Sequence, residues 1–537
     1  MPPAPARSRR RRPTHDRPIR RAALGLAAIA VSVLIPVVRA PQPAAAATVA
    51  PNVLILLSDD QAMGTLGAMP ELMRHVAAPG VTFSRGYISD PLCCPSRASI
   101  LTGLYATHTG VFTNGEGSMN TQHGGTEAFE DNGNEDRTIA TTLQAAGYQT
   151  ALFGKFLNGY ETYSIDHPGP SGPYFRPDGW DVWRAFYGDN GAYLNYDLLR
   201  YDVGTEPRLV HYGLQNRKGA TDISTTVLGQ QLRFWLGHRD ASVPFFAYYA
   251  PYSPHGPSSY DARDASKFSD LPPFTSPALN ESPNAKSDMP TYVRNVNLTA
   301  LQLKNTQTAR IRQFRSLASF DRQIGQVMTY LERTPDPRTG LPAIQSTIVL
   351  YLSDNGVMWG EHDLRGKSVP YERSTHVPMF LRDDAAPSST GYIPGSTSRR
   401  LVANIDVAPT IYQLTGVAPP GPLDGVSMLQ GHDDGVMLAS LAQTPTSAPS
   451  FCGVVLPSGW KYVVYVPLAG QIEAPFEDEL YRIPDDPAEL RNLVDAVDDP
   501  AAMAAESRAK ALLQATTGGD HWCELPGVPE SWYDAWA

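Results

Sequence analysis

The chain has 537 residues, 42% of them hydrophobic, and carries a formal net charge of −10 at pH 7. This length predicts a large core plus a second unit rather than one small domain. The 48 prolines and 44 glycines favour a loop-rich enzyme over a helical bundle. A negatively charged chain repels nucleic acid and acidic membrane surfaces, so we expect no nucleic-acid partner.

The first 47 residues differ in composition from the rest. Eight arginines precede residue 22, residues 22–38 are mostly apolar, and three alanines, 45–47, follow. This three-part form predicts a signal peptide over residues 1–47, and Arg20-Arg21 weakly resembles a twin-arginine export signal. We expect a secreted or cell-envelope protein. Removal of the leader, whose net charge is +8, would leave the mature chain with a net charge of −18. The alternative is an uncleaved leader as membrane anchor, because the apolar run nears the roughly 17 residues of a spanning helix.

A buried strand is predicted near the start of the mature chain. Residues 52–57 form an uninterrupted apolar run that ends in Ser58-Asp59-Asp60. Such runs are typical of central parallel strands, which are covered on both faces. Because sites in parallel sheets form at the carboxyl ends of strands, Asp59 and Asp60 are candidate site residues. A polar turn after a strand is the alternative.

Two adjacent cysteines, Cys93 and Cys94, open the next informative stretch. Pro95 follows them and suits the first turn of a helix. The thiols would then lie at a helix N-terminus, where anions are favoured, and Arg97 adds a positive charge. Neighbouring cysteines do not readily bond each other, so a reactive thiol is one interpretation. A capped helix with a buried thiol is the other.

The middle of the chain alternates helical and strand-like segments. Helices are predicted at 138–146, 221–236 and 309–331, and strands at 148–153 and 244–250. This alternation predicts a mostly parallel α/β sheet with helices on both faces. Lys155 and His255 each follow a strand, on the expected site edge. Single residues of these types are more often solvated or structural.

A second acidic strand lies far downstream. Residues 346–352 are mostly apolar and lead into Ser353-Asp354-Asn355. If the two acidic strands are neighbours, three carboxylates and one amide meet, a set that suits Ca²⁺ or Mg²⁺. No His/Cys spacing typical of zinc is present. The charged, glycine-rich residues 359–367 predict a loop that folds back over the site.

The C-terminal part is predicted to be a small antiparallel α+β subdomain. Residues 443–450 resemble a linker, 452–466 a hairpin, 479–483 a strand and 500–514 a helix. The predicted domains are therefore a catalytic part, 48–442, and a C-terminal subdomain, 443–537. Export permits disulfides, and we expect Cys452 and Cys523 to pair because both lie in this last part.

Several motifs together resemble the sulfatase family, within the alkaline-phosphatase-like superfamily. They are Cys93-Cys94-Pro95-Ser96-Arg97 with Leu101-Thr102-Gly103, then residues 353–356, 405–410, 479–481 and 486–490. The resemblance implies a large mixed, mostly parallel sheet sandwiched by helices. It also implies that a formylglycine-generating enzyme oxidises Cys93 to Cα-formylglycine during maturation.

The same resemblance implies a role for each site residue. The catalytic residues are Cys93, Arg97, Lys155, His255 and Lys367, and the metal ligands are Asp59, Asp60, Cys93, Asp354 and Asn355. The metal is expected to be Ca²⁺ rather than Mg²⁺. The cations would neutralise the transferred group, and His255 would protonate the leaving oxygen or bind sulfate.

One segment departs from the family pattern. Many members carry a Gly-Lys-x-His segment, whereas this chain has Asn158 at the end of residues 154–158. This feature and the double cysteine resemble the glucosamine-6-sulfatase branch. Asn158 is expected to replace the histidine as a substrate-binding group, with His362 nearby.

The function expected from this resemblance is that of a secreted sulfatase acting on a sulfated sugar or an aryl sulfate. One alternative is a phosphodiesterase or phosphonate monoester hydrolase on the same fold. A dianionic phosphate monoester would favour a second metal, and one set of four oxygen ligands favours the sulfatase. A non-catalytic carbohydrate-binding relative is a further alternative, which the intact Cys93, Arg97, Lys155, His255 and Lys367 disfavour.

Overall fold

The computed structural model describes residues 49–115, 123–169, 172–188, 192–213, 222–279, 281–282, 284–386, 390–443, 448–466, 477–494, 496–517, 520–521 and 525–526. The signal peptide predicted for residues 1–47 lies outside these ranges and stays a prediction. Within the described ranges, no helix is long and apolar enough to cross a membrane.

A ten-stranded mixed sheet lies at the centre of residues 49–537, with the strand order β13-β2-β12-β9-β1-β8-β4-β5-β6-β7. The strands are β1 (Asn52–Ser58), β2 (Val81–Phe83), β4 (Gln149–Gly154), β5 (Val182–Tyr187), β6 (Tyr196–Asp202), β7 (Arg208–Tyr212), β8 (Phe245–Ala250), β9 (Thr347–Ser353), β12 (Met379–Asp383) and β13 (Ser396–Ser398). The central strands β9, β1, β8, β4 and β5 run parallel. Strands β12, β6 and β7 pair antiparallel with their neighbours. The predicted mixed, mostly parallel sheet is confirmed.

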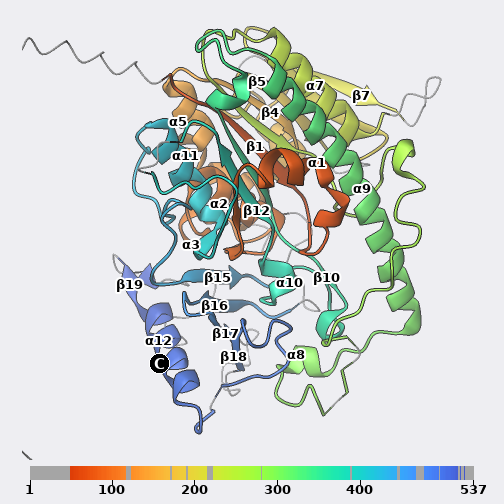
Figure 1. Ribbon diagram of the computed structural model, residues 1–537, viewed down its shortest axis with the longest axis vertical. Helices are drawn as coiled ribbons and strands as arrows, with labels where there is room; N and C mark the ends of the chain where they lie inside the picture. The colour runs from red at the N-terminus through yellow and green to blue at the C-terminus, as the bar shows by residue number, and fades with distance from the viewer. Residues whose placement is uncertain are drawn as a thin grey trace, which may run out of the picture. The chain divides into compact units, whose positions relative to one another are not determined.

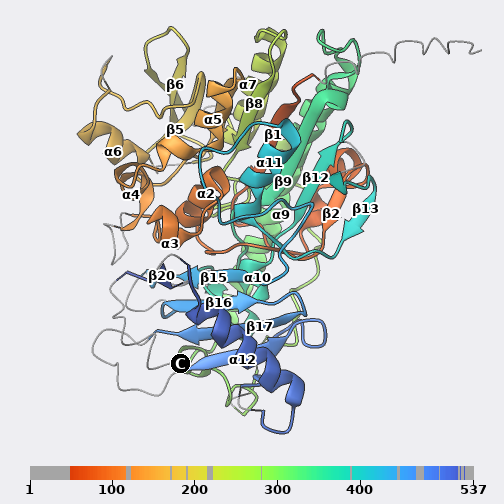
Figure 2. The same ribbon diagram turned by 90° about the vertical axis from the view of Figure 1, so that its left-hand side faces the viewer.

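Helices cover both faces of this sheet. They are α1 (Pro70–Leu72), α2 (Cys93–Thr102), α5 (Ile139–Ala145), α7 (Ser224–His238), α9 (Ala300–Arg333) and α11 (Val407–Thr415). Successive side chains of a strand point to opposite faces. Val53, Ile55 and Leu57 accordingly join a core with α2, α5 and α11, and Leu54 and Leu56 join a second core with α1, α7 and α9. Figure 1 shows the two helix layers on opposite sides of the sheet, and Figure 2 views the layer of α2, α5 and α11 from the front.

The strands predicted at 148–153 and 244–250 correspond to β4 and β8. Each observed strand begins one residue later than predicted. Helix α9 begins at Ala300, well before the predicted residue 309. Its true start is a capping box, in which Thr299 and Gln302 each bind the other's backbone N–H. Its first turn is largely exposed, so the apolar pattern of the buried face starts late. The sequence analysis does not predict strands β5, β6 and β7. Strand β5 joins the sheet by parallel pairing with β4, and β6 and β7 extend it by antiparallel pairing.

Short elements connect the sheet to the site and to the C-terminal part. They are α3 (Ala106–Thr109), α4 (Gly125–Asp131), α6 (Tyr160–Asp166), α8 (Thr291–Arg294), α10 (Glu372–Thr375), β3 (Gly86–Tyr87), β10 (Met358–Trp359), β11 (Arg365–Gly366) and β14 (Val402–Ala403). Strands β3 and β14 pair in parallel, and β10 and β11 form a small antiparallel pair.

A second, four-stranded antiparallel sheet contains β15 (Val436–Ser440), β16 (Phe451–Val455), β17 (Trp460–Tyr465) and β18 (Asp478–Arg482). Helix α12 (Pro500–Gln514) packs on this sheet, as Figure 2 shows, and a short pair, β19 (Thr516–Thr517) and β20 (Asp520–His521), follows. The predicted small antiparallel α+β part is confirmed. Strand β15 precedes residue 443, so the sheet draws on both sides of the predicted domain boundary, which itself stays a prediction. Cys452 is disulfide-bonded, whereas Cys523 lies outside the described residues.

Candidate active site

The two acidic strand ends meet. Strands β1 and β9 pair in register, Ser58 opposite Ser353, so the residues that follow them lie side by side. The backbone N–H of Asp60 donates to Asp354 Oδ1 (3.1 Å). The side-chain amide of Asn355 donates to Asp60 Oδ1 (2.7 Å). The predicted gathering of these oxygen ligands at the carboxyl edge of the sheet is therefore present.

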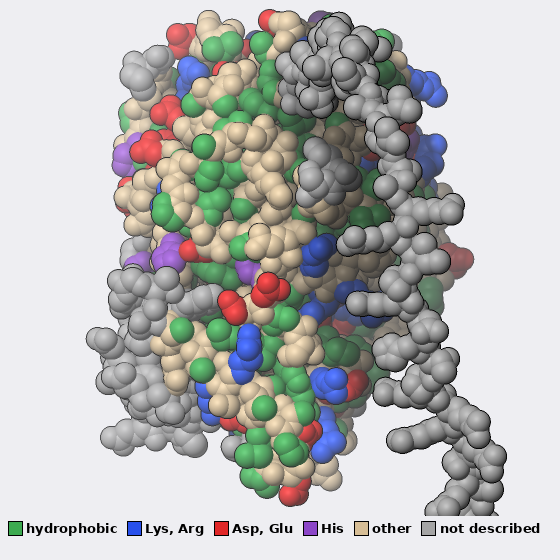
Figure 3. All heavy atoms as spheres, turned by 60° about the vertical axis from the view of Figure 1, so that its left-hand side comes forward, with side chains coloured by type: hydrophobic (Ala, Val, Ile, Leu, Met, Phe, Trp, Pro, Cys, Tyr) green, Lys and Arg blue, Asp and Glu red, His purple; other side chains and the backbone are tan. Residues whose placement is uncertain are grey.

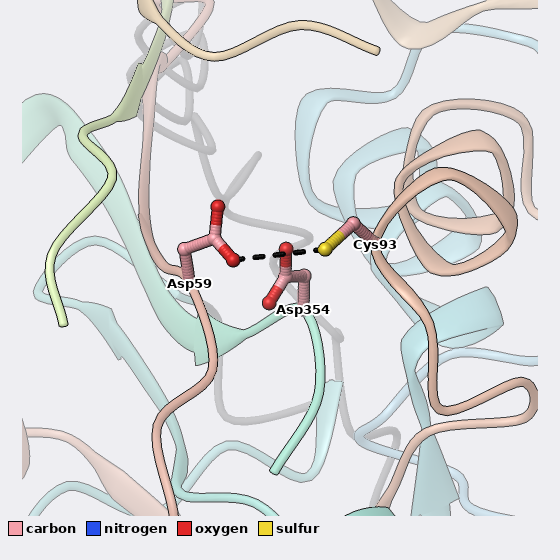
Figure 4. Close-up of side chains that lie close together, drawn as sticks. All are labelled: Asp59, Cys93 and Asp354. Carbon is pink, nitrogen blue, oxygen red and sulfur yellow. Dashed lines mark hydrogen bonds between the residues drawn. The ribbon is translucent and has the colours of Figure 1, made fainter. Parts of the chain in front are cut away.

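Helix α2 aims its first residue at these carboxylates. Cys93 opens the helix directly after Leu92, which is extended (φ −142°), and every residue of α2 is buried. Its Sγ lies 3.7 Å from Asp59 Oδ1. Figure 4 shows Cys93, Asp59 and Asp354 converging from the start of the helix and from the ends of two strands. The predicted placement of Cys93 beside the acidic residues holds.

Arg97 lies one turn further along the same helix, where its guanidinium joins both strand ends. Its Nε donates to Asp354 Oδ2 (2.9 Å) and its Nη2 to Asp59 Oδ2 (3.3 Å). Its Nη1 donates to the carbonyl of Lys155 (2.9 Å). Because Arg97 is wholly buried, it is a fixed positive charge beneath the cluster.

Two lysines approach from separate loops. Lys155 follows β4, and its Nζ donates to Asp59 Oδ2 (2.7 Å). Lys367 follows β11, and its Nζ donates to Cys93 Sγ (2.7 Å) and also contacts Asp60 Oδ1. The predicted return of residues 359–367 to the site is thus present.

His255 follows β8 and lies at the open side of the cluster. Its Nε2 is 3.6 Å from Asp60 Oδ2, and its side chain is 35% exposed, more than either lysine. Tyr193 holds the His255 segment, since its hydroxyl lies 2.8 Å from the carbonyl oxygens of both Tyr252 and His255. Sequence reasoning missed Tyr193, because no motif or strand end marks it.

The charges of the cluster stabilise one another. Burial alone would raise the pKa of Asp59, but Lys155, His255 and Arg97 hold it well below its usual range. Burial and the neighbouring Asp59 raise the pKa of Asp354. Lys155 keeps its proton, because Asp59 and Cys93 outweigh its burial and raise its pKa. The surface shows no such concentration of charge on the face drawn in Figure 3, where basic side chains are interspersed with acidic ones.

The unmodified thiol of Cys93 is a weak nucleophile at neutral pH. Burial raises its pKa to about 11 despite the nearby Lys155 and Lys367. The thiolate is the nucleophilic form of cysteine, so the reduced side chain is almost entirely protonated.

The same residues could hold a metal ion. Two sets lie with their ligand atoms within 4.8 Å of one another: Asp59, Cys93 and Asp354, and Asp59, Asp60 and His255. Asn355 Oδ1 is buried without a hydrogen-bond donor, although buried amide oxygens are normally satisfied. Carboxylate and amide oxygens are the ligands that Ca²⁺ and Mg²⁺ prefer. The donor set and the orphaned oxygen fit a hard cation.

The remaining two predicted residues have other partners. Asn158 binds Cys94: its N–H donates to Cys94 Sγ (3.0 Å), and the thiol faces its Oδ1 (3.4 Å). His362 is buried, with Nδ1 2.9 Å from Glu281 Oε2 and its ring against Tyr371. These contacts do not test a role in substrate binding, so the predicted roles of both residues stay predictions.

The site thus gathers three cations, Arg97, Lys155 and Lys367, and the carboxylates that pair with them near Cys93, in a mixed α/β fold. A family model described as Sulfatase matches residues 51–417, and the chain belongs to the sulfatase family. The resemblance that the motifs predict is confirmed.

Relatives of known name agree with the family. Human N-acetylglucosamine-6-sulfatase is 29% identical over 400 residues, which cover 72% of this chain and 65% of the relative. The extracellular sulfatase SULF-1 homologue of Drosophila melanogaster is 27% identical over 393 residues, covering 71% and 31%. The chain therefore spans less than two thirds of the length of these relatives.

Solved structures share the fold. The structure of BT4656 in complex with its substrate D-glucosamine-2-N,6-O-disulfate matches with a TM-score of 0.62 at 20% identity, covering 85% of this chain and 96% of that one. A phosphonate monoester hydrolase of Agrobacterium radiobacter matches with a TM-score of 0.61 at 19% identity, covering 85% and 94%. At these identities the likeness establishes the fold alone.

Proposed function

We propose that this protein is a secreted sulfatase that hydrolyses sulfate esters of sugars or aryl alcohols to the alcohol and sulfate. The observation that carries the proposal is the position of Cys93 Sγ, 2.7 Å from Lys367 Nζ and 3.7 Å from Asp59 Oδ1. The residue that the family converts to its nucleophile thus faces both the positive charges and the metal-binding carboxylates.

Cys93 is the residue proposed to be oxidised to Cα-formylglycine by a formylglycine-generating enzyme. When hydrated, that aldehyde would supply a geminal diol. One hydroxyl would attack sulfur as the S–O bond to the alcohol breaks. The second hydroxyl would then lose its proton, and cleavage of the C–O bond to the transferred group would release sulfate and regenerate the aldehyde. Ca²⁺ held by Asp59, Asp60, Asp354 and Asn355 would supply positive charge that acidifies a bound hydroxyl and polarises sulfate oxygens.

The other residues bind the sulfate group and move protons. Arg97, Lys155 and Lys367 neutralise the three sulfate oxygens, and their existing ion pairs hold them in place. His255 donates a proton to the ester oxygen as the bond to sulfur breaks, which its position at the open side permits.

The substrate class follows from relatives rather than from geometry. The human relative is named N-acetylglucosamine-6-sulfatase, which supports a sulfated sugar as substrate. The predicted signal peptide and the extracellular Drosophila relative support export.

A phosphonate or phosphodiester hydrolase is the second candidate, because the Agrobacterium enzyme of that name shares the fold. The two functions differ in the central atom and in the charge of the transferred group. Specificity constants of the purified enzyme for 4-nitrophenyl sulfate, phenyl 4-nitrophenyl phosphonate and bis(4-nitrophenyl) phosphate separate them. The proposal requires sulfate to be preferred, and a higher constant for either phosphorus ester would replace it.

The variant Cys93→Ala tests the proposed nucleophile. We expect it to lose sulfate-ester hydrolysis while its melting temperature stays close to that of the parent. Cys94→Ser, which changes the neighbouring thiol but keeps an acceptor for the Asn158 N–H, is the comparison and should keep most of its activity. Substantial turnover by Cys93→Ala would refute the mechanism.

A further inference from the structure

The Lys367 loop, residues 360–368, has a strained backbone. Its residues His362, Asp363 and Ser368 have φ of +53°, +60° and +62°, values that are costly for residues other than glycine. Such conformations persist only where surrounding contacts hold them, and they gather at functional sites. The contacts that hold this loop also hold Lys367, whose Nζ lies 2.7 Å from the sulfur atom of the predicted nucleophile.

A buried ion pair fixes the strained part of the loop. Lys286 Nζ donates to Asp363 Oδ2 (2.8 Å) and to the carbonyl of Val296 (2.5 Å). Lys286 is only 1% exposed and Asp363 only 3%. Charged side chains are almost never buried to this degree unless they are paired. The pair thus joins the Lys367 loop to a segment that lies 77 residues earlier in the chain.

The residue before Asp363 is held by the same part of the chain. The backbone N–H of His362 donates to the carbonyl of Ala278 (2.6 Å), and its Nδ1 lies 2.9 Å from Glu281 Oε2. The two consecutive residues with positive φ therefore each have a buried partner within residues 278–286.

A second anchor lies on the other side of Lys367. The backbone N–H of Ser368 donates to the carbonyl of Pro91 (3.1 Å), two residues before Cys93. Lys367 is thus placed between an anchor beside the predicted nucleophile and the ion pair of Lys286. Both anchors limit how far its ammonium group can move from Cys93.

The C-terminal sheet supports the α8 segment, residues 284–296, which supplies Lys286. The hydroxyl of Tyr481, on β18, lies 3.2 Å from Met289 Sδ. Both side chains join a buried apolar cluster that also contains Val369, two residues after the catalytic lysine. The C-terminal sheet therefore contacts the Lys367 loop through the α8 segment.

We propose that Lys286 and Asp363 are positioning residues for Lys367. Their ion pair, supported by the C-terminal sheet, holds the Lys367 ammonium group where it meets the sulfate group beside Cys93. The inference rests on the proposed sulfatase activity, in which Lys367 neutralises the transferred group. It gives the C-terminal sheet a part in catalysis although that sheet supplies no residue of the proposed site.

A double-mutant cycle on the full chain tests whether the pair acts through Lys367. The neutral variant, with both Lys286→Met and Asp363→Asn, leaves no unpaired buried charge, and asparagine tolerates a positive φ, so it should stay folded. Its kcat/KM for 4-nitrophenyl sulfate should fall about tenfold, because a displaced charge stabilises the transition state less well. Added to Lys367→Met, the same two substitutions should change kcat/KM by less than twofold.

Affinity for inorganic sulfate, measured by titration calorimetry, gives the same comparison without turnover. The neutral variant should bind sulfate more weakly than the parent, and this difference should vanish in the Lys367→Met background. Lys286→Arg keeps the charge and should retain most of the parent kcat/KM.

Arg338→Met is the matched control. Arg338 is also a largely buried cation paired with a buried carboxylate, that of Asp336 (2.7 Å). It holds the start of β1 through the carbonyl of Ala50 and the side chain of Asn52, at the opposite end of the strand from Asp59. Its loss should lower the melting temperature but leave kcat/KM within twofold of the parent.

Two results would overturn the positioning role and leave the proposed function standing. One is a neutral variant that hydrolyses 4-nitrophenyl sulfate as well as the parent does. The other is a tenfold loss that is the same with and without Lys367, since a loss of that kind reflects stability alone. A parent enzyme that hydrolyses no sulfate ester would overturn both proposals.

Discussion

Cys94 Sγ accepts a hydrogen bond from the backbone N–H of Asn158 at 3.0 Å. This contact ties the start of α2 to the loop that carries Lys155, three residues earlier. Burial raises the pKa of the Cys94 thiol to about 12, so it is an inert group here. The second cysteine of the pair, which the sequence leaves without a role, fastens one catalytic segment to another.

The Cys94 contact predicts a difference between two substitutions. Cys94→Ala removes the acceptor of the half-buried Asn158 N–H, which should cost about 0.5–1.5 kcal/mol of unfolding free energy and lower sulfatase kcat as Lys155 shifts. Cys94→Ser keeps a hydrogen-bond acceptor, so its losses of unfolding free energy and of kcat should be smaller. Urea unfolding and steady-state kinetics measure these effects, and equal losses in the two variants would contradict the positioning role.

Tyr193 is predicted to act through His255. Tyr193→Phe removes the hydroxyl at the carbonyls of Tyr252 and His255, and misplacing a general acid should lower kcat by about tenfold or more. The loss should be larger for alkyl sulfates, whose leaving groups need the proton, than for 4-nitrophenyl sulfate.

Tyr249→Phe is the matched control for Tyr193. It also deletes a buried hydroxyl that donates to a carbonyl, that of Thr225 at 2.8 Å, but away from the His255 segment. The ratio of its activity to that of the parent should be the same for alkyl sulfates as for 4-nitrophenyl sulfate. An equal loss on alkyl and aryl sulfates in Tyr193→Phe would show that the hydroxyl serves stability alone.

Much of this site can be predicted from the sequence. The apolar runs that end in Asp59 and in Asp354 predict central strands, and the motif around Cys93 predicts the facing helix. These features are local, so a short stretch contains the whole signal. The rest depends on partners that are distant in the sequence. His362 is hydrogen-bonded to Glu281, 81 residues away, and the Tyr193 hydroxyl donates to the carbonyl of His255, 62 residues away.

The same limit applies to the fold. Strand β5 extends the sheet by parallel pairing with β4, and β6 and β7 extend it by antiparallel pairing. The mixed polar and apolar sequence of these three strands does not resemble the continuous runs of β1 and β9. The start of α9 depends on a polar capping box at Thr299 rather than on periodicity. Such features follow from hydrogen bonding and tertiary packing, which hydrophobic patterns do not report.

Calcium is predicted to stabilise the folded protein through Asn355. An ion that binds only the folded state raises the melting temperature, and the unpartnered Asn355 Oδ1 is one of its expected ligands. Asn355→Leu should remove most of the calcium-dependent rise seen by calorimetry after chelation. A rise of equal size in this variant, or full activity of the chelated parent, would contradict the metal site.

Asp321 predicts a pH-dependent stability term far from the active site. Burial raises its pKa to about 6, although the N–H groups of Leu72 and Glu71 partly oppose this. A carboxyl whose folded pKa is raised stabilises least when ionised, so its contribution falls as pH rises from 3.8 through 6. Relative to the parent, Asp321→Asn should gain about 2 kcal/mol of unfolding free energy between pH 4 and pH 7.5.

Urea unfolding of both proteins at the two pH values measures this difference, since other groups cancel in the comparison. Asp383→Asn is a second test on another element: burial also raises the pKa of this carboxyl, so its difference from the parent should change with pH in the same direction. A difference between Asp321→Asn and the parent that stays constant with pH would show that Asp321 titrates normally.

The central claim is that Cys93, placed 2.7 Å from Lys367 Nζ, is converted to formylglycine. Mass spectrometry of the peptide that contains Cys93, from enzyme active on 4-nitrophenyl sulfate and with aldehydes trapped by a hydrazide, tests it most directly. We predict an aldehyde at Cys93 and an unmodified thiol at Cys94, with the trapped fraction tracking activity between preparations. Active enzyme whose Cys93 is entirely thiol would contradict the account.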